Sequence, residues 1–128
     1  MPTILIVDDD DAIRAILYEV LSEQYECHTA STADEALQYL EVEDYDAILT
    51  DLKMPGLDCV SLLKQVQLRD VDTPVIFISG KSSETDSTRL IELGAFAYLT
   101  KPFELDEVEK TIERAVTRNR PTESPGKF

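Results

Sequence analysis

The chain has 128 residues, 43% of them hydrophobic and 30% charged, a composition that excludes a disordered or low-complexity protein and suits one domain with one core. Its 26 Asp and Glu against 12 Lys and Arg give a formal net charge of -14. A field of this sign repels phosphate backbones and anionic lipids, so we expect no direct nucleic-acid or membrane binding, and instead a divalent cation or a basic protein surface as partner.

Four short apolar runs and one more polar run alternate with helix-like segments along the chain. The first three residues lack the basic region of a secretory signal, and no apolar run approaches the roughly 20 residues that span a bilayer, so we expect a cytoplasmic protein. The runs that predict strands are residues 4–7, 25–29, 47–49, 75–78 and 95–99. All but one are continuously apolar, as in parallel strands covered on both faces, whereas the more polar run at 25–29 suits an edge of the sheet.

Between these runs, apolar residues recur at helical spacing, in residues 13–21, 33–40, 62–66 and 105–116. Thr32 to Glu35 predicts a capping box at the start of the second helix, and Gly94 is expected just beyond the end of the fourth. This fourth helix is almost entirely polar over residues 82–89, which fits either a solvated helix or a marginally stable element that can shift.

The C-terminal residues differ in composition from the rest of the chain. Residues 121–128 combine Pro, Ser, Thr and Gly without periodicity, as linkers do. We therefore assign residues 1–120 to one domain and residues 121–128 to a polar linker or tail.

The cysteines and the histidine predict little chemistry. Cys27 and Cys59 make no disulfide framework, and we expect reduced, partly buried thiols. His28 is the only histidine and has no second ligand at metal-binding spacing, so we interpret it as an ordinary edge-strand residue.

Five strand–helix units in this order predict a doubly wound α/β fold. It is a (βα)5 three-layer sandwich of the flavodoxin-like class, with a parallel five-stranded sheet in the order 2-1-3-4-5. Ligand sites in such sheets lie beyond the carboxyl ends of the strands, at the switch point. The residues that follow each strand are therefore the candidates for function.

Acidic and polar side chains follow four of these strands. Asp8 to Asp11 follow the first, Asp51 the third, Ser79 the fourth and Lys101 the fifth. An acidic run after a strand often caps a helix, and we expect Asp10 or Asp11 to cap the first helix. The other side chains are expected to converge on one edge of the sheet.

The converging side chains predict a Mg²⁺-dependent phosphoryl-transfer site. Crowded carboxylates of Asp8, Asp9 and Asp51 repel one another unless a cation neutralises them. Ligands that are all oxygen suit a hard ion, and Mg²⁺ prefers one or two carboxylates, several waters and a phosphate oxygen. Lys101 supplies positive charge and Ser79 a hydrogen-bond donor for an oxyanion, and a carboxylate can itself become an aspartyl phosphate.

Four motifs give the chain a specific resemblance. They are ILIVDDD at residues 4–10, DLKMPGLD at 51–58, FISG at 77–80 and YLTKPF at 98–103. Together they resemble the receiver domain of two-component response regulators, over essentially the whole chain up to the tail.

The resemblance implies a role for each candidate residue. Asp51 would accept a phosphoryl group from the phosphohistidine of a histidine kinase or a phosphotransfer domain. Asp9 would bind Mg²⁺ directly and Asp8 directly or through water, and the carbonyl of Lys53 would be a further ligand. Lys101, whose bond to Pro102 is cis in this family, would pair with the phosphoryl group, and Ser79 would donate a hydrogen bond to it.

The resemblance also implies a switch in a regulatory protein rather than a metabolic enzyme. Ser79 would move toward the phosphoryl oxygen, and Tyr98 would turn into the space it vacates; the alternative for Tyr98 is a packed strand residue with its hydroxyl at the surface. The surface of the fourth helix, fifth strand and fifth helix would then change its partners. We expect an output domain or a partner protein there, with a phosphorylation-dependent homodimer as an alternative.

Lys53 and Lys81 lie two residues beyond Asp51 and Ser79. They are either solvated surface lysines or side chains that flank the path of the hydrolytic water. The second interpretation predicts a long-lived phosphoryl group.

Two other functions compete with this interpretation. A Mg²⁺-dependent phosphatase of the haloacid dehalogenase type also has Asp-x-Asp after its first strand, as Asp8 to Asp10 do, but would leave the motif at residues 51–56 unexplained. An interaction module on the same fold that is never phosphorylated would have no need of the site residues, all of which are present here.

Overall fold

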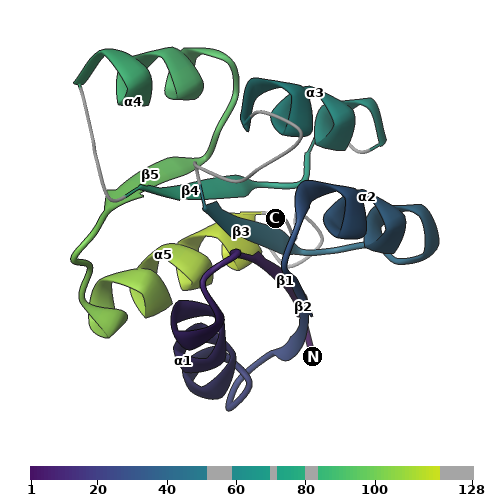
Figure 1. Ribbon diagram of the computed structural model, residues 1–128, viewed down its shortest axis with the longest axis vertical. Coiled ribbons are helices and arrows are strands. Elements are labelled where there is room, and N and C mark those ends of the chain that lie inside the picture. Colours follow the sequence, from purple (N-terminus) through teal and green to yellow (C-terminus); the bar gives the residue numbers. More distant parts are fainter. Residues whose placement is uncertain (52–58, 70–71, 80–83, 119–128) are drawn as a thin grey trace, which may run out of the picture.

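The computed structural model describes residues 1–51, 59–69, 72–79 and 84–118 (Figure 1). Strands and helices alternate from one end to the other. The strands are β1 (Thr3–Val7), β2 (Glu26–Ala30), β3 (Ala47–Asp51), β4 (Val75–Ser79) and β5 (Ala97–Thr100). The helices are α1 (Asp11–Leu21), α2 (Ala33–Val42), α3 (Cys59–Arg69), α4 (Glu84–Glu92) and α5 (Leu105–Arg118).

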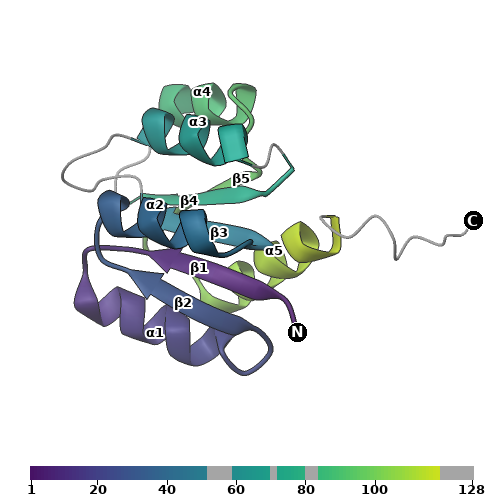
Figure 2. The ribbon, with the colours of Figure 1, turned by 90° about the vertical axis from the view of Figure 1, so that its right-hand side faces the viewer.

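The strands form one parallel sheet in the order β2-β1-β3-β4-β5, as the sequence predicts. Helices α1 and α5 cover one face of the sheet, and α2, α3 and α4 cover the other (Figures 1 and 2). Alternate residues of each strand point to the two faces, so Ile4 and Ile6 pack in the core with α1 and α5, while Leu5 and Val7 pack with α2 and α3. The chain is therefore a doubly wound three-layer sandwich, and the edge position of β2 explains its polar sequence.

Two strands start later than the sequence predicts because backbone groups just before them bond to helices. The Tyr25 amide donates to the Leu21 carbonyl at the end of α1, so β2 starts at Glu26. The Ala95 amide donates to the Leu90 carbonyl and closes the end of α4, so β5 starts at Ala97.

The predicted caps form, with one change. Asp10 caps α1 and accepts hydrogen bonds from the amides of Ala12 and Ile13. Thr32 caps α2 and accepts from the Glu35 amide, but the Glu35 carboxylate reaches one residue further back than a capping box requires. It accepts from both the amide and the hydroxyl of Ser31, which together offer two donors in place of one.

Gly94 lies just beyond α4, as predicted, with a φ of 114°. This left-handed conformation favours glycine, and a Cβ at this position would collide with the side-chain amide of Gln67. That amide donates a hydrogen bond of 3.0 Å to the Leu93 carbonyl and so joins α3 to the end of α4.

Candidate functional site

The parallel sheet brings the predicted residues to one edge. Asp51 and Ser79 are the last residues of the neighbouring strands β3 and β4. Asp8 follows β1, and its amide continues the ladder by donating to the Ala30 carbonyl of β2. Lys101 follows β5, and its amide donates a 2.7 Å hydrogen bond to the Ser79 carbonyl. Because all these strands run the same way, their carboxyl ends meet, and the predicted convergence is confirmed.

Three carboxylates form the centre of the site. One oxygen from each of Asp8, Asp9 and Asp51 lies within 4.8 Å of the others. Asp8 and Asp51 are buried, whereas Asp9 is exposed. The cluster therefore opens to solvent on the Asp9 side, and a small cation could reach all three oxygens from there.

Asp8 is held in an electrostatically unfavourable position. Its Oδ1 accepts a 2.8 Å hydrogen bond from the Asp10 amide, but its buried Oδ2 has no hydrogen-bond partner among the described residues. Burial raises the pKa of Asp8 from 3.8 to about 6, and repulsion from Asp51 and Asp9 adds to this rise. The Asp10 amide and the Lys101 ammonium oppose it. A cation at Oδ2 would relieve both the repulsion and the unmet hydrogen bond.

Lys101 supplies the positive charge of the site. Its Nζ lies 3.6 Å from Asp51 Oδ2 and 3.8 Å from Asp8 Oδ2, and its side chain is mostly buried. The bond between Lys101 and Pro102 is cis, as the resemblance implies. Ser79 is fully buried beside this group.

The family model for the response regulator receiver domain matches residues 4–113. The chain belongs to this family. It is a regulatory module of two-component signalling, in agreement with the interpretation of its motifs.

Known relatives agree with this assignment. The DNA-binding transcriptional regulator NtrC of Klebsiella pneumoniae is 36% identical over 129 aligned residues, which cover 94% of this chain and 28% of NtrC. The solved receiver domain of Francisella response regulator 1452 is 33% identical, with a TM-score of 0.85, covering 92% of this chain and 98% of that one. A CheY-like receiver domain protein from Methanospirillum hungatei JF-1 is 30% identical, with a TM-score of 0.88, covering 94% and 97%. The chain thus spans less than a third of NtrC and nearly all of the two isolated receiver structures.

Arg14, on helix α1, contacts the backbone of the site, a role that the sequence did not reveal. Its guanidinium donates a 2.7 Å hydrogen bond to the Asp8 carbonyl and a 2.5 Å hydrogen bond to Asp11 Oδ1. It therefore bridges both ends of the acidic segment and fixes the backbone from which Asp8 and Asp9 project. Its spacing from Asp11 is that of an ordinary helical ion pair, so only the contact with the Asp8 carbonyl reveals this role.

Tyr98 points into the receiver domain. Its ring packs against the core on the side of α2, α3 and α4. Its hydroxyl is buried and has no hydrogen-bond partner among the described residues. The alternative of a hydroxyl at the surface is therefore wrong, while the movement of Tyr98 in a switch stays a prediction.

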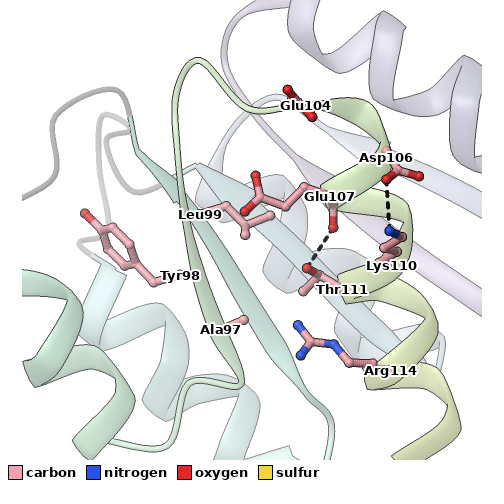
Figure 3. Close-up of a pocket in the computed structure, with 9 residues that line it drawn as sticks. All are labelled: Ala97, Tyr98, Leu99, Glu104, Asp106, Glu107, Lys110, Thr111 and Arg114. Carbon is pink, nitrogen blue, oxygen red and sulfur yellow. Dashed lines mark hydrogen bonds and ion pairs between the residues drawn. The ribbon is translucent and has the colours of Figure 1, made fainter.

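A hollow lies between β5 and α5 of the receiver domain (Figure 3). Acidic residues line its upper part in this view and basic residues its lower part, where Arg114 lies. Lys110 Nζ pairs with Asp106 Oδ2 at 3.2 Å, and the Thr111 hydroxyl donates to the Glu107 carbonyl. This charged surface belongs to the face that the resemblance assigns to output partners.

Some predictions fall outside the described residues. They concern Lys53, Lys81 and residues 121–128, together with the side chain of Cys59. Cys27 is a half-buried free thiol, and burial raises its pKa to about 11. No helix in the described parts of the chain has the length and apolar character needed to cross a bilayer.

Proposed function

We propose that this receiver domain accepts a phosphoryl group on Asp51 from the phosphohistidine of a histidine kinase or a phosphotransfer domain, in a Mg²⁺-dependent reaction. The observation that carries the proposal is the contact of one ammonium with two carboxylates inside a cluster of three. In the reaction an oxygen of Asp51 forms a bond to phosphorus while the bond from phosphorus to the histidine nitrogen breaks. The product is an acyl phosphate.

The donor set fits Mg²⁺. Asp8, Asp9 and Asp51 offer only oxygen, and the buried Asp8 Oδ2 has no hydrogen-bond partner among the described residues. We expect these carboxylates and the carbonyl of Lys53 to hold the ion, which would supply positive charge to the phosphoryl oxygens.

The remaining residues of the site would stabilise the phosphoryl group. The Lys101 ammonium would exchange its contact with Asp51 Oδ2 for one with a phosphoryl oxygen, since both are anionic and the lysine side chain is long. The Ser79 hydroxyl, on the strand beside Asp51, would donate a hydrogen bond to another phosphoryl oxygen.

Asp51→Asn is expected to abolish phosphorylation, because the amide lacks the nucleophilic carboxylate oxygen pair. The protein is incubated with acetyl phosphate and Mg²⁺, and its intact mass is measured for the gain of one phosphoryl group. Asp34→Asn, an exposed aspartate in the first turn of α2, should be labelled like the parent, and a chelator should prevent labelling of both. Labelling of Asp51→Asn, or labelling that only Asp8→Asn abolishes, would contradict the proposal and favour the phosphatase chemistry. A parent protein that takes up no phosphoryl group would favour the unphosphorylated interaction module.

We infer that phosphorylation changes the surface of α4, β5 and α5. Movement of Ser79 toward the phosphoryl group would open space beside β4, and Tyr98 on the paired strand β5 already points inward with an unpaired hydroxyl among the described residues. The hollow between β5 and α5 lies on this surface. We propose that it meets an output domain or a partner protein, with a phosphorylation-dependent homodimer as the alternative.

The phosphoryl group is expected to be long-lived, a prediction that rests on sequence. Hydrolysis needs a water in line with the acyl phosphate of Asp51. A protonated lysine at position 53 could lie across this path and cannot act as a base, and we expect Lys81 to add a second positive charge near the same opening. Lys53→Asn should therefore hasten loss of phosphate by about tenfold, or about 1.4 kcal/mol of barrier. Single-turnover decay of the phosphorylated protein measures this, and equal rates or a slower variant would make Lys53 an ordinary surface lysine.

We further propose that residues 1–120 form the receiver unit, with residues 121–128 as a linker or tail. The described helix α5 ends at Arg118, close to this boundary. The acidic surface would favour a basic face on the kinase or phosphotransfer partner over nucleic acid or an anionic membrane. With a partner of this kind, we expect the domain to act in the cytoplasm.

A further inference from the structure

A second group of metal-ligating side chains lies at the outer edge of the sheet. Glu26 and His28 are two residues apart on β2, so their side chains share one face, and Glu43 follows the end of α2 on that face. We call these three residues the β2 cluster. Glu26 pairs with Thr3 at the amino end of β1, whereas Asp8 follows the carboxyl end of β1, so the β2 cluster is separate from the Asp51 site.

The imidazole of His28 is held in one orientation. Its Nδ1 lies 2.8 Å from the hydroxyl of Tyr45, a residue that is only 4% exposed. The ring of Tyr39 stacks on the imidazole with centroids 5.8 Å apart, and the ring of Tyr45 meets it edge-on at 5.5 Å. A histidine ligand whose other nitrogen is fixed by a hydrogen bond is typical of metal sites, because that bond sets the tautomer and the ring orientation.

The surroundings of this imidazole favour a cation. Nε2 lies 3.2 Å from Glu26 Oε2, and Nδ1 lies 3.9 Å from Glu43 Oε2. Among the described residues, His28 is the only ion-pair partner of both carboxylates. Glu43 also stands at the C-terminal end of α2, where the helix dipole adds negative potential.

We propose that Glu26, His28 and Glu43 bind a divalent transition-metal ion of the Zn²⁺ type at a site distinct from the Mg²⁺ site. One ligand atom from each residue lies within 4.8 Å of the others. An imidazole nitrogen with two carboxylates suits Zn²⁺, whereas Mg²⁺ prefers ligands that are all oxygen. Nε2 is the nitrogen that would bind the ion, beside Glu26, because Nδ1 already faces the Tyr45 hydroxyl. The Glu43 carboxylate, which lies nearest to Nδ1, would turn toward the ion, and the single proton of the neutral ring would reside on Nδ1 and be donated to the Tyr45 hydroxyl. A neutral ring that carries its proton on Nε2 would move that proton to Nδ1 when the ion binds, with no net release. A ring protonated on both nitrogens would release the Nε2 proton to solvent.

The bound ion would join the edge strand to the end of α2. Glu26 and His28 belong to β2, and Glu43 is the residue at which α2 ends. The edge strand has a neighbour on one side only, so a metal bridge would restrain it against opening. The proposal does not depend on phosphoryl chemistry and is tested without a phosphodonor.

The single histidine makes the test specific, since every imidazole signal in ¹⁵N-detected NMR comes from His28. Zn²⁺ is titrated into the whole chain with Mg²⁺ in excess, so that the cluster of oxygen ligands is already occupied. We expect the Nε2 resonance to shift on Zn²⁺ addition and the Nδ1–H tautomer to predominate, with no change on adding Mg²⁺ alone. Glu26→Gln and Glu43→Gln should each weaken Zn²⁺ binding by about tenfold, as loss of one charged ligand contributes about 1.4 kcal/mol.

A matched control separates the site from general attraction to an acidic protein. Glu41→Gln removes an exposed carboxylate from the same helix, paired with Arg69, and should leave the Zn²⁺ affinity unchanged. Melting temperatures without added metal verify that each variant is folded. An imidazole spectrum that excess Zn²⁺ does not change would overturn the proposal, as would equal losses of affinity in Glu41→Gln and Glu43→Gln.

Discussion

Asp8→Asn is expected to make the Mg²⁺-free receiver domain more stable, by about 3 kcal/mol at pH values above about 7. Asp8 is 1% exposed, and its pKa rises from 3.8 to about 6, chiefly through burial. Asn has the same shape and can still accept the hydrogen bond of the Asp10 amide, but it carries no charge to desolvate. The variant therefore removes the cost of a buried carboxylate without leaving a cavity.

The sign of the pH dependence follows from this pKa. Below about pH 4 the Asp8 carboxyl is protonated in both the folded and the unfolded protein, so the parent and the variant should be almost equally stable. Between about pH 4 and pH 6 the folded parent holds a proton that the unfolded chain releases, so its stability falls as the pH rises. The advantage of Asp8→Asn should grow through this window and level off above it. Urea unfolding at a series of pH values, with a chelator present, measures the difference.

Mg²⁺ should reduce the stability advantage of Asp8→Asn over the parent, and reverse it once the ion exceeds about 150 times the Kd of the parent. An ion that binds the folded state stabilises the parent by mass action, and the variant lacks one of its ligands. Asp9→Asn should likewise raise the melting temperature of the Mg²⁺-free protein and lose most of the gain from Mg²⁺. The control is Asp10→Asn, which keeps a helix-capping side chain on α1 and should respond to Mg²⁺ like the parent. A loss of stability in Mg²⁺-free Asp8→Asn, or an advantage that does not depend on pH, would contradict the electrostatic account.

The site was predictable because its geometry is a property of the topology. The continuous apolar runs required strands covered on both faces, and parallel strands bring their carboxyl ends together. Asp51 and Ser79 end neighbouring strands, so their proximity follows from the strand order alone. The contact of Lys101 with Asp8 and Asp51 follows in the same way from its place after β5.

Contacts between residues of different elements were less predictable, because no periodicity encodes them. The Arg14 side chain reaches back to a backbone carbonyl six residues earlier, and any residue type at position 8 would present that carbonyl. No sequence motif indicated a role for His28, because its partners Glu43 and Tyr45 come after α2 in the sequence whereas His28 comes before it. The interpretation of His28 as an ordinary edge-strand residue placed it on the correct strand but missed these partners.

Lys101→Ala is expected to bind Mg²⁺ about tenfold more tightly, which corresponds to about 1.4 kcal/mol. The ammonium lies 3.6 Å from Asp51 Oδ2 and 3.8 Å from Asp8 Oδ2, and so competes electrostatically with any cation at these oxygens. Pairs of charges at such distances interact by several kcal/mol at the effective dielectric of a protein, and relaxation of the lysine into solvent reduces the difference. Lys110→Ala removes an exposed lysine that pairs with Asp106 on α5 and should leave the affinity unchanged. Calorimetric titration with Mg²⁺ compares the three proteins.

The same substitution should separate phosphorylation from its structural response. Without the ammonium, Asp51 keeps its nucleophilic oxygens and Mg²⁺ binds, so acetyl phosphate should still label Lys101→Ala to some extent. The phosphoryl group, however, would lack the cation that draws β5 toward it, and Lys101 is joined to Ser79 by its backbone amide. The NMR spectrum of the phosphorylated variant should therefore show little change at Tyr98 and along α4, where the parent shifts. Weaker Mg²⁺ binding by Lys101→Ala would contradict the first prediction and would mean that the lysine chiefly holds the carboxylates in place. A full spectral change at Tyr98 in the phosphorylated variant would contradict the second and would mean that the conformational change does not require Lys101.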